Sequence, residues 1–372
     1  MTPRNKPDVL YLHVPFCRTI CSYCDFCHTV YKHEDGDAWL DALKKELALR
    51  EINRSLRTVY IGGGTPSVLE EAQLERLLSM LDPYTGSVRE YTIEINPETL
   101  SAAKAEILAS HGIRRASIGF QTSDEKMLKK MNRRHTMADM ERCVKELRDA
   151  GIDNLSFDLM YSLPDQTLAD LQQSVNDALK LQPKHLSLYS LTIEENTVFA
   201  KTGAEPCDED TEADMYRWIC DTLPAYGFRQ YEISNFALPG YESMHNTAYW
   251  EYEDFYGISC GASGKEKNIR YDNTRSLRSY LTDPLQREEI LLSERDRMFE
   301  TVMMGLRLKR GFSLSRFAET FGVPLTDAYG DKIREMIRQE MLETDGDRIR
   351  CTEKGFPVLN EILVCLMDDE GE

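Results

Sequence analysis

Three cysteines near the amino terminus have the residue type and the spacing for metal chemistry. Cys17, Cys21 and Cys24 form the pattern C-x3-C-x2-C. An ordinary [4Fe–4S] cluster takes four cysteine ligands. Three thiolates would therefore leave one iron open to bind another molecule, as catalytic zinc sites keep one position open. The spacing also fits a zinc knuckle, whose fourth ligand would be one of three neighbouring side chains, Cys27, His28 or His33.

A glycine triplet follows the cysteines at the end of the next predicted strand. The run reads Gly62-Gly-Gly-Thr-Pro66 and begins about 40 residues after the cysteines. Glycines there let backbone N–H groups approach a ligand and form a polar nest. Alone, the triplet also fits a tight strand-to-loop turn. Together, the two motifs resemble the radical S-adenosylmethionine (SAM) superfamily, which implies that the open iron binds SAM and that the glycines receive its methionine end.

Composition restricts the class of protein. The chain has 372 residues, 41% of them hydrophobic, which predicts one large domain with a smaller one attached. No run of 18 apolar residues occurs, so no membrane span is expected. Ten cysteines without an amino-terminal secretory pattern indicate a reducing compartment, and we expect a cytoplasmic protein. A net charge of −18 argues against nucleic acid as a partner.

Strand-like apolar runs alternate with helical patterns over the first half of the chain. The predicted strands are Val9–Val14, Thr58–Ile61, Tyr91–Ile95, Ala116–Phe120, Leu155–Leu159 and His185–Leu191. The helices predicted between them include Ala38–Arg50, Glu70–Leu81, Met137–Ala150 and Thr167–Leu181. This alternation is typical of a parallel sheet with crossover helices. We therefore predict an α/β fold with a partial (β/α)6 barrel.

Polar residues come at the carboxyl ends of three successive predicted strands. These residues are Glu94, Gln121 and Asp158, and the strands are otherwise built of Ile, Phe and Leu. Each could be a buried structural group by itself. Barrel enzymes, however, carry their active sites at the carboxyl ends of the strands. The repetition over three strands predicts a shared pocket.

The rest of the chain is less regular until a change of character near residue 295. We expect an acidic loop over Glu194–Asp214, a helix near Glu212–Tyr226 and a strand at Gln230–Ser234. Helices near Arg297–Arg307 and Asp327–Glu340, and a hairpin turning at 345–347, predict a mostly helical, winged-helix-like domain over 295–372. Its 12 Lys and Arg against 16 Asp and Glu give no sign of DNA binding. The predicted division is a barrel over 1–235, a linker region over 236–294 and the small domain.

Further motifs extend the resemblance over nearly the whole length. They are Tyr11-Leu-His-Val-Pro-Phe-Cys, Ile61-Gly-Gly-Gly-Thr-Pro-Ser, Thr92-Ile-Glu-Ile-Asn-Pro-Glu, Ser117-Ile-Gly-Phe-Gln-Thr, Asn132-Arg-Arg-His-Thr, Phe157-Asp-Leu-Met-Tyr-Ser-Leu-Pro-Asp-Gln-Thr, Tyr231-Glu-Ile-Ser-Asn-Phe-Ala and His245-Asn-Thr-Ala-Tyr-Trp. In this order they resemble the branch of the superfamily that contains oxygen-independent coproporphyrinogen III oxidase and the HemW-type heme chaperones. The resemblance implies three ligands, a [4Fe–4S] cluster, SAM and heme.

The resemblance also implies a role for individual residues. The three motif cysteines would hold the cluster. The SAM-binding residues would be Tyr11, Tyr23, Gly63, Gly64, Thr65, Glu94, Gln121, Arg133 and Asp158. Arg133 and Asp158 suit the two ends of an amino-acid zwitterion, because a guanidinium binds a carboxylate and a carboxylate accepts from an ammonium. Alternatively, these two side chains form a salt bridge with each other.

Departures from the oxidase pattern favour the chaperone. The oxidase has a further cysteine two places after the third ligand, where this chain has Phe26, followed by Cys27. Only ten residues precede Tyr11, whereas the oxidase has a longer extension. The chaperone signature His-Asn-x-x-Tyr-Trp is present at 245–250. A smaller departure is Ser259 in Gly257-Ile-Ser, where relatives commonly have Gly-x-Gly, and it puts a backbone contact to SAM from this loop in doubt.

The His-Asn-x-x-Tyr-Trp run has chemistry of its own. Histidine is a common ligand of heme iron. In a helix, His245 and Tyr249 would face the same way with Trp250 beside them, which fits the edge of a porphyrin. Otherwise, the histidine bonds to backbone and the two aromatics fill core. The favoured hypothesis is a carrier that binds heme and delivers it to apo-hemoproteins such as respiratory enzymes, with a homodimer as a further expectation. The alternatives are coproporphyrinogen oxidation and a radical porphyrin methyltransferase.

Overall fold

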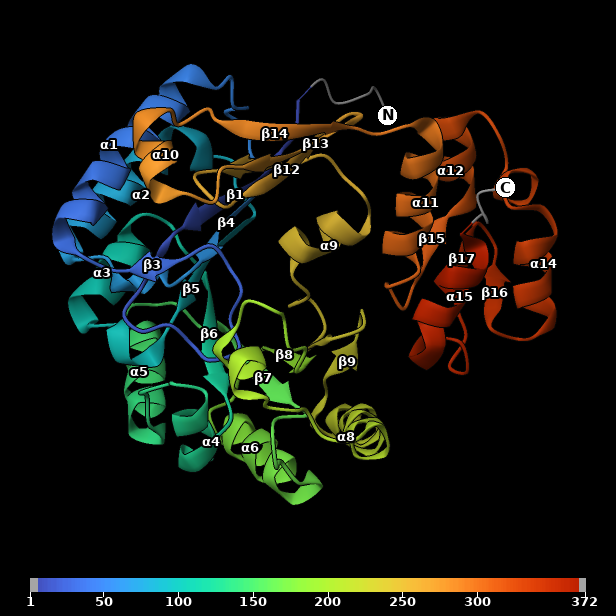
Figure 1. The fold of residues 1–372 in the computed structure, drawn as a ribbon, viewed down its shortest axis with the longest axis horizontal. Coiled ribbons are helices and arrows are strands. Elements are labelled where there is room, and N and C mark those ends of the chain that lie inside the picture. The colour runs from blue at the N-terminus through green and yellow to red at the C-terminus, as the bar shows by residue number, and fades with distance from the viewer. Residues whose placement is uncertain (1–5, 368–372) are drawn as a thin grey trace.

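The protein is built around one large mixed sheet, shown in Figure 1. The computed structural model describes residues 6–367. The nine strands of this sheet lie in the order β11-β1-β4-β5-β6-β7-β8-β10-β9. Six consecutive ones are parallel: β1 (Val9–Val14), β4 (Thr58–Gly63), β5 (Glu90–Ile95), β6 (Arg115–Gln121), β7 (Asn154–Tyr161) and β8 (His185–Ser190). All six predicted strands are therefore confirmed.

The two faces of the parallel strands differ in polarity. Alternate residues such as Ala116, Ile118 and Phe120 of β6 are buried in the main hydrophobic cluster. The other face carries Ser117, and the register places Glu94 beside it. Side chains alternate along a strand, so one face packs on helices while the other lines an interior. This pattern is what gathers polar side chains inside the sheet.

Helices α1–α6 connect the parallel strands and follow the outer side of the sheet in Figure 1. They are α1 (His33–Leu49), α2 (Glu71–Thr85), α3 (Ala102–Ser110), α4 (Glu125–Lys130), α5 (Met137–Asp149) and α6 (Leu168–Lys180). Both α5 and α6 start with capping boxes, in which Thr136 pairs with Asp139 and Thr167 with Asp170. Such boxes satisfy the free N–H groups of a first turn and fix where the helix starts.

The sheet does not close into a barrel. Its edges are β11 (Tyr256–Ile258), parallel to β1, and β9 (Arg229–Gln230), antiparallel to β10 (Asn235–Ala237). The single strand predicted at Gln230–Ser234 is wrong, because the chain turns between β9 and β10. The acidic loop predicted at Glu194–Asp214 contains α7 (Val198–Thr202) and the start of α8 (Glu209–Thr222). Asp208 caps α8 through the Thr211 amide, so acidic residues here serve as a helix start.

The segment 236–294, predicted as a linker region, contains regular elements. Helix α9 (Met244–Trp250) precedes β11. A second sheet has the order β12-β13-β14, with β12 (Ser263–Glu266), β13 (Ile269–Asn273) and β14 (Arg287–Leu291). Helix α10 (Leu277–Thr282) brings Tyr280 into the main hydrophobic cluster. Two short strands, β2 (Phe16–Cys17) and β3 (Thr29–Val30), frame the cysteine loop.

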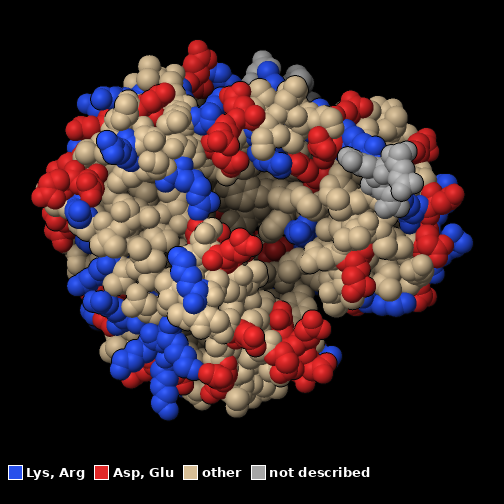
Figure 2. Space-filling model, in the orientation of Figure 1, with Lys and Arg blue, Asp and Glu red and all other residues tan. Residues whose placement is uncertain are grey.

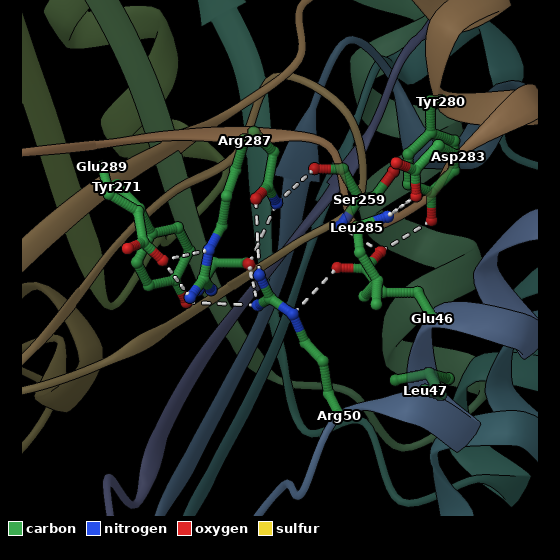
Figure 3. Close-up of polar contacts among 12 residues, drawn as sticks. Glu46, Leu47, Arg50, Ser259, Tyr271, Tyr280, Asp283, Leu285, Arg287 and Glu289 are labelled. Carbon is green, nitrogen blue, oxygen red and sulfur yellow. Dashed lines mark hydrogen bonds and ion pairs between the residues drawn. The ribbon is translucent and has the colours of Figure 1, made fainter.

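A buried polar network joins α1 to the loop after β11, as Figure 3 shows. Glu46 is fully buried, and its Oε2 accepts from the Ser259 amide at 2.9 Å and from Tyr280 Oη at 2.7 Å. Arg50 Nε lies 3.4 Å from Glu46 Oε1, and Arg50 Nη1 donates to the Gly257 carbonyl at 2.8 Å. Trp39 Nε1 donates to Ser259 Oγ at 2.8 Å. We call these residues (Trp39, Glu46, Arg50, Ser259, Tyr280) the α1–β11 network.

The carboxyl-terminal unit has its own hydrophobic cluster, from Val302 to Leu366. Its helices are α11 (Glu294–Gly305), α12 (Leu314–Phe321), α13 (Leu325–Ala328), α14 (Gly330–Arg338) and α15 (Leu359–Leu366). A small sheet in the order β15-β17-β16 contains β15 (Phe312–Ser313) and the predicted hairpin, β16 (Leu342–Asp345) and β17 (Arg348–Cys351). On the described part of the face in Figure 2, acidic and basic side chains are interspersed over this unit. Within residues 6–367, no helix is both long and apolar enough to span a membrane.

Candidate functional site

A cavity of about 360 Å³ lies inside the sheet at the carboxyl ends of the parallel strands. Its wall comes from β4 to β8, the loop with the motif cysteines, and α9. The predicted residues that line it are Cys17, Cys21, Cys24, Tyr23, Gly63, Gly64, Thr65, Glu94, Gln121, Arg133 and Asp158. Residues from six separate segments of the sequence thus converge on one space. Tyr11 is the one predicted SAM residue that does not line it.

The three cysteines meet donors from the strands below them. Thr65 Oγ1 lies 3.8 Å from Cys17 Sγ, and Arg133 Nη1 lies 3.7 Å from Cys21 Sγ. Burial raises the pKa of Cys17 to about 12 and that of Cys24 to about 11. Metal binding requires the thiolate, so these thiols need a strongly positive centre to lose their protons. The iron ions of a cluster would supply that charge.

The zinc-knuckle alternative gains no support. Within the described chain, no group of three His, Cys, Asp or Glu side chains is arranged round a single ion. A cubane differs, because each of its ligands binds a different iron. Cys27 does not line the cavity; its Sγ faces away and donates to the Arg275 carbonyl at 3.0 Å. His28 does line it, with Nδ1 3.8 Å from Cys24 Sγ.

Arg133 is held by neutral acceptors and not by Asp158. Its Nη1 donates to Asn96 Oδ1 at 2.9 Å, and its Nη2 donates to the Gly119 carbonyl at 2.7 Å. No ion pair joins it to Asp158 among residues 6–367, so the salt-bridge alternative is wrong. Asn96 also donates to Thr65 Oγ1 at 3.0 Å. Arg133 is therefore fixed beside Cys21, with its charge directed at the cysteine loop.

Two half-buried carboxyl groups, Glu94 and Asp158, face the cavity. Glu94 accepts from Tyr60 Oη at 2.9 Å and from the Gly63 amide at 3.0 Å. Burial, followed by the nearby Asp158 charge, raises the pKa of Glu94 to about 7. Burial also raises the pKa of Asp158, while Ser117 Oγ donates to it at 3.0 Å. Near neutral pH, Glu94 can therefore either accept or donate, and a cationic ligand would favour its ionised form.

Packing within the protein already requires glycine at the end of β4. Gly63 has a φ of 111°, in a region that favours glycine. A Cβ at Gly63 would lie 2.7 Å from the His13 ring, and one at Gly64 would lie 2.5 Å from the Phe16 carbonyl. The absent side chains therefore make room for β1 and the cysteine loop, while the Gly63 amide is already bonded to Glu94.

Two further predicted residues differ in position. Gln121 lines the cavity at the end of β6, where a φ of 61° and a shift in register against β7 interrupt the strand. Tyr11 lies on β1 outside the cavity, and its hydroxyl is 2.9 Å from His13 Nδ1. The other nitrogen of His13 is 2.7 Å from the Cys27 carbonyl. Tyr11 thus supports the cysteine loop through His13 instead of lining the predicted SAM pocket.

His245 lies beneath the cavity and is 1% exposed. Its Nδ1 is 3.0 Å from Thr58 Oγ1, and its Nε2 is 2.7 Å from Tyr249 Oη. The ring also stacks on Tyr60 with 5.1 Å between centroids. Burial, together with the charges of nearby arginines, lowers the pKa of His245 to about 3. His245 and Tyr249 do share a helix face, but in this arrangement neither ring nitrogen is free to bind iron.

Trp250 points to the carboxyl-terminal unit instead. It does not line the cavity, and the Arg307 guanidinium lies 5.9 Å from its ring. Its buried Nε1 has no hydrogen-bond partner among residues 6–367. The expected porphyrin edge formed by three side chains is therefore not present. The reason is that the helix is short and anchored: Glu90 accepts from the Met244 amide at 2.7 Å and the His245 amide at 2.9 Å.

Several cavity residues were not predicted from the sequence. They are Asn96, Arg115, Ser117, Ser187, Tyr189 and Asn246. Asn96 follows Glu94 by two residues, and Ser117 and Arg115 precede Gln121 by four and six residues, so counting in twos could have found these three. Ser187 and Tyr189 lie on β8, where no site residue was predicted. Asn246 could not be found in this way, because only tertiary packing places α9 under the sheet.

Comparison with known proteins places the chain in a family. Residues 11–178 match the radical SAM superfamily, and residues 292–358 match the HemN C-terminal domain. A Lactococcus lactis protein named heme chaperone HemW is 40% identical, covering 98% of this chain and 99% of that protein. The HemW of Escherichia coli is 33% identical over 96% of this chain and 97% of its own length. This chain belongs to the HemW family. Its fold is also that of Escherichia coli coproporphyrinogen III oxidase (HemN), with a TM-score of 0.84, 21% identity and coverage of 97% and 90% of the two chains.

Membership of the HemW family and the radical SAM superfamily implies a [4Fe–4S] cluster and SAM, and the residues fit both groups. Cys17, Cys21 and Cys24 would hold three irons. Gly64, Thr65, Glu94, Gln121 and Asp158 would surround SAM in the adjoining space. The bound pair supplies one-electron chemistry at the cavity. The chain itself contributes a recessed interior lined by polar and apolar side chains, in which donors such as Arg133 are already fixed.

Proposed function

We propose that the protein is a heme carrier that holds a cluster and SAM and transfers heme to apo-hemoproteins such as respiratory enzymes. The observation that carries this proposal is the pair of full-length HemW relatives, both named heme chaperones. These relatives align over the cavity and the carboxyl-terminal unit alike. The proposal therefore concerns the whole chain and not one shared domain.

The mouth of the cavity offers a surface for a flat macrocycle. Phe26 and Tyr189 both line the cavity, yet 64% of Phe26 and 42% of Tyr189 are exposed. Large aromatic side chains bury much apolar area when a ring packs on them. Solvent-exposed aromatics at a cavity mouth therefore favour a partly apolar ligand. We propose that the porphyrin lies here, between the cysteine loop and the end of β8.

We choose the ligand of the heme iron by comparing how accessible the candidate histidine side chains are. His28 is the histidine that lines the cavity. His33 instead pairs with Asp37 at 3.3 Å and with Glu70 at 3.1 Å. His245 is the alternative that the family signature suggests, but it would first have to break the hydrogen bond to Thr58 or Tyr249. We therefore propose His28 as the ligand and His245 as a support for the floor.

Heme titration of the reconstituted protein tests both the carrier function and the choice of His28 as the iron ligand. We expect about one heme per chain in the wild type and a shifted Soret band in His28→Ala, because loss of an axial imidazole changes the ligand field of the iron. His33→Ala serves as the matched control. A His245→Ala variant that folds normally but loses the Soret feature, while His28→Ala keeps it, would restore His245 as the ligand. Absence of heme binding in the wild type would refute the carrier function.

Oxidation of coproporphyrinogen is the second candidate, since the cavity fits both a cluster and SAM. Anaerobic incubation with SAM, dithionite and coproporphyrinogen III, followed by chromatography, distinguishes the two. We expect negligible turnover. Accumulation of protoporphyrinogen with consumption of SAM would favour the oxidase.

We further propose that the carrier works in the cytoplasm and forms a homodimer. All ten cysteines are free thiols, which supports a reducing compartment. Size-exclusion chromatography with and without heme tests the dimer. Heme transfer to a purified apo-cytochrome, followed by absorbance, tests delivery.

A further inference from the structure

Arg115 places a buried positive charge at the floor of the cavity. It begins β6 and is 2% exposed. It faces the same side as Ser117 and Gly119, and all three line the cavity. Within the part of the chain that the structure describes, the Nε of Arg115 has no hydrogen-bond partner. Among residues 6–367, no carboxylate forms an ion pair with its guanidinium.

The acidic groups nearest to Arg115 already have donors of their own. The charged and titratable groups around it are Glu90, Tyr60, Tyr231 and Asp158. Glu90 accepts from three groups at the start of α9, namely Ser243 Oγ and the Met244 and His245 amides. Asp158 accepts from Ser117. Arg115 therefore retains donors that no protein group uses, and a buried charge without such partners is costly.

Asn246 brings a second polar group to the same floor from a different element. It is the residue of α9 that lines the cavity. Its backbone amide donates to Ser243 Oγ at 3.2 Å, while its side-chain amide makes no hydrogen bond within the described chain. The contacts of His245 with Thr58 and Tyr249 hold α9 in place. Within the His-Asn-x-x-Tyr-Trp run at 245–250, Asn246 is thus the residue that reaches the space for the ligand.

We propose that Arg115 and Asn246 bind a carboxylate of the molecule that enters the cavity. A guanidinium presents paired N–H donors that match a carboxylate, and an amide N–H₂ adds a further donor. Arg133 differs, because its terminal nitrogens already donate to Asn96 and to the Gly119 carbonyl, whereas the Arg115 guanidinium makes no hydrogen bond to the described residues. Two ligands carry the required group: heme through a propionate, and SAM through its amino-acid end. The heme source rests on the function proposed above, whereas the SAM source does not.

Titration with heme and with heme dimethyl ester, which lacks free carboxylates, tests the assignment. We expect the wild type to prefer heme over the diester by about tenfold or more, the range of a charge-assisted hydrogen bond. Arg115→Gln should reduce this preference to about twofold or less, and Arg115→Lys and Asn246→Ala should give intermediate values. Arg114→Gln is the matched control, because Arg114 is the exposed neighbour and its side chain donates to the Ala109 and Ile113 carbonyls. SAM affinity is measured on the same proteins by equilibrium dialysis.

The outcomes separate this inference from the heme-carrier function. If Arg115→Gln weakens SAM binding but leaves the heme preference unchanged, the assignment stands with SAM as the source of the carboxylate. If both ligands bind Arg115→Gln, Arg115→Lys and Asn246→Ala as they bind the wild type, the inference is wrong, although the carrier function survives. If the wild type binds no heme, the carrier function fails and the SAM measurement still decides the role of Arg115. Circular dichroism and cluster content establish whether each variant is folded. If Arg115→Gln does not fold, Arg115→Lys takes its place in the comparison.

Discussion

The α1–β11 network and the cavity both bury charged side chains, yet they treat them differently. In the network, Glu46 and Arg50 form an ion pair, as Figure 3 shows. Glu46 also accepts from Tyr280 and the Ser259 amide, and Arg50 donates to the Gly257 carbonyl. Burial raises the pKa of Glu46 and, in the cavity, the pKa values of Glu94 and Asp158. The cavity differs because, among residues 6–367, neither Glu94 nor Asp158 forms an ion pair. Arg115, also in the cavity, has an Nε without a hydrogen-bond partner in the described part of the chain.

This difference shows which buried charges maintain the structure and which await a ligand. Polar groups that satisfy one another hold two segments in a fixed relation. The α1–β11 network holds α1 and the loop at Gly257–Ser259 in a fixed relation. This loop continues to Gly261, which lies close to Cys27 and His13. Polar groups left unsatisfied in a cavity have a cost that a bound ligand can remove. Substitutions in the two regions should therefore affect different measurements.

Loss of a motif cysteine should have the largest effect, and only on the cavity. Cys17→Ala, Cys21→Ala or Cys24→Ala leaves the cubane with two protein ligands, so we expect reconstitution of the cluster to fail. Cys27→Ala is the control, since its thiol faces the Arg275 carbonyl outside the cavity. Iron and sulfide analysis measures the result. Normal cluster content in Cys21→Ala, or its loss in Cys27→Ala, would contradict the assignment.

Removing Arg50 should have the largest effect on stability. Arg50→Ala leaves Glu46 buried without its cation, which costs about 3–5 kcal/mol when a buried pair is broken. Arg54→Ala, an exposed arginine close in sequence, is the control. Denaturant unfolding gives the free energies. A loss below about 1 kcal/mol for Arg50→Ala would mean that the network is not satisfied as the structure indicates.

Glu94→Gln should act in the opposite way to Arg50→Ala. It should weaken SAM binding and change the free energy of unfolding little. Loss of a charged acceptor corresponds to about 1.5–3 kcal/mol, or a fall in affinity of about tenfold or more. The pKa of Glu94 adds a pH dependence with a definite sign. Because a cationic ligand needs the ionised carboxylate, wild-type affinity should rise from pH 6 to pH 8, through the pKa near 7. The Glu94→Gln variant should lose that rise in equilibrium dialysis; an identical pH profile would exclude Glu94 from the SAM site.

Ser259→Gly should have the smallest effect of these changes. Ser259 has a φ of 79°, which glycine adopts more readily, but its hydroxyl accepts from the buried Trp39 indole. The relief of backbone strain and the loss of a hydrogen bond are each about 1 kcal/mol and have opposite signs. We expect a net change in unfolding free energy below about 1 kcal/mol and unchanged SAM binding, because the Ser259 amide bonds to Glu46 and not to the cavity. A clear loss of SAM affinity would place this loop in the site after all.

Much of the fold could be predicted from local patterns. The six parallel strands were recognisable because each is a short apolar run between helical patterns, and β1 matches its predicted bounds, Val9–Val14. The starts of α5 and α6 follow from Thr-x-x-Asp runs that cap helices. Long-range pairings were less accessible. Nothing local indicates that β11 joins the sheet beside β1, or that β9 and β10 are separate strands.

The candidate site divides in the same way. The sequence by itself determined which residues can bind metal or accept a cation, since residue type and spacing identified Cys17, Cys21, Cys24, Glu94 and Asp158. The tertiary structure decided where such groups lie and which of their atoms are free. His245 has the chemistry of an iron ligand, but packing under the sheet bonds both of its nitrogens. Arg115 has no motif of its own, but packing leaves it inside the cavity with an unpartnered Nε. The physical reason is that hydrogen-bond partners come from distant segments, so the availability of a side chain depends on the whole fold.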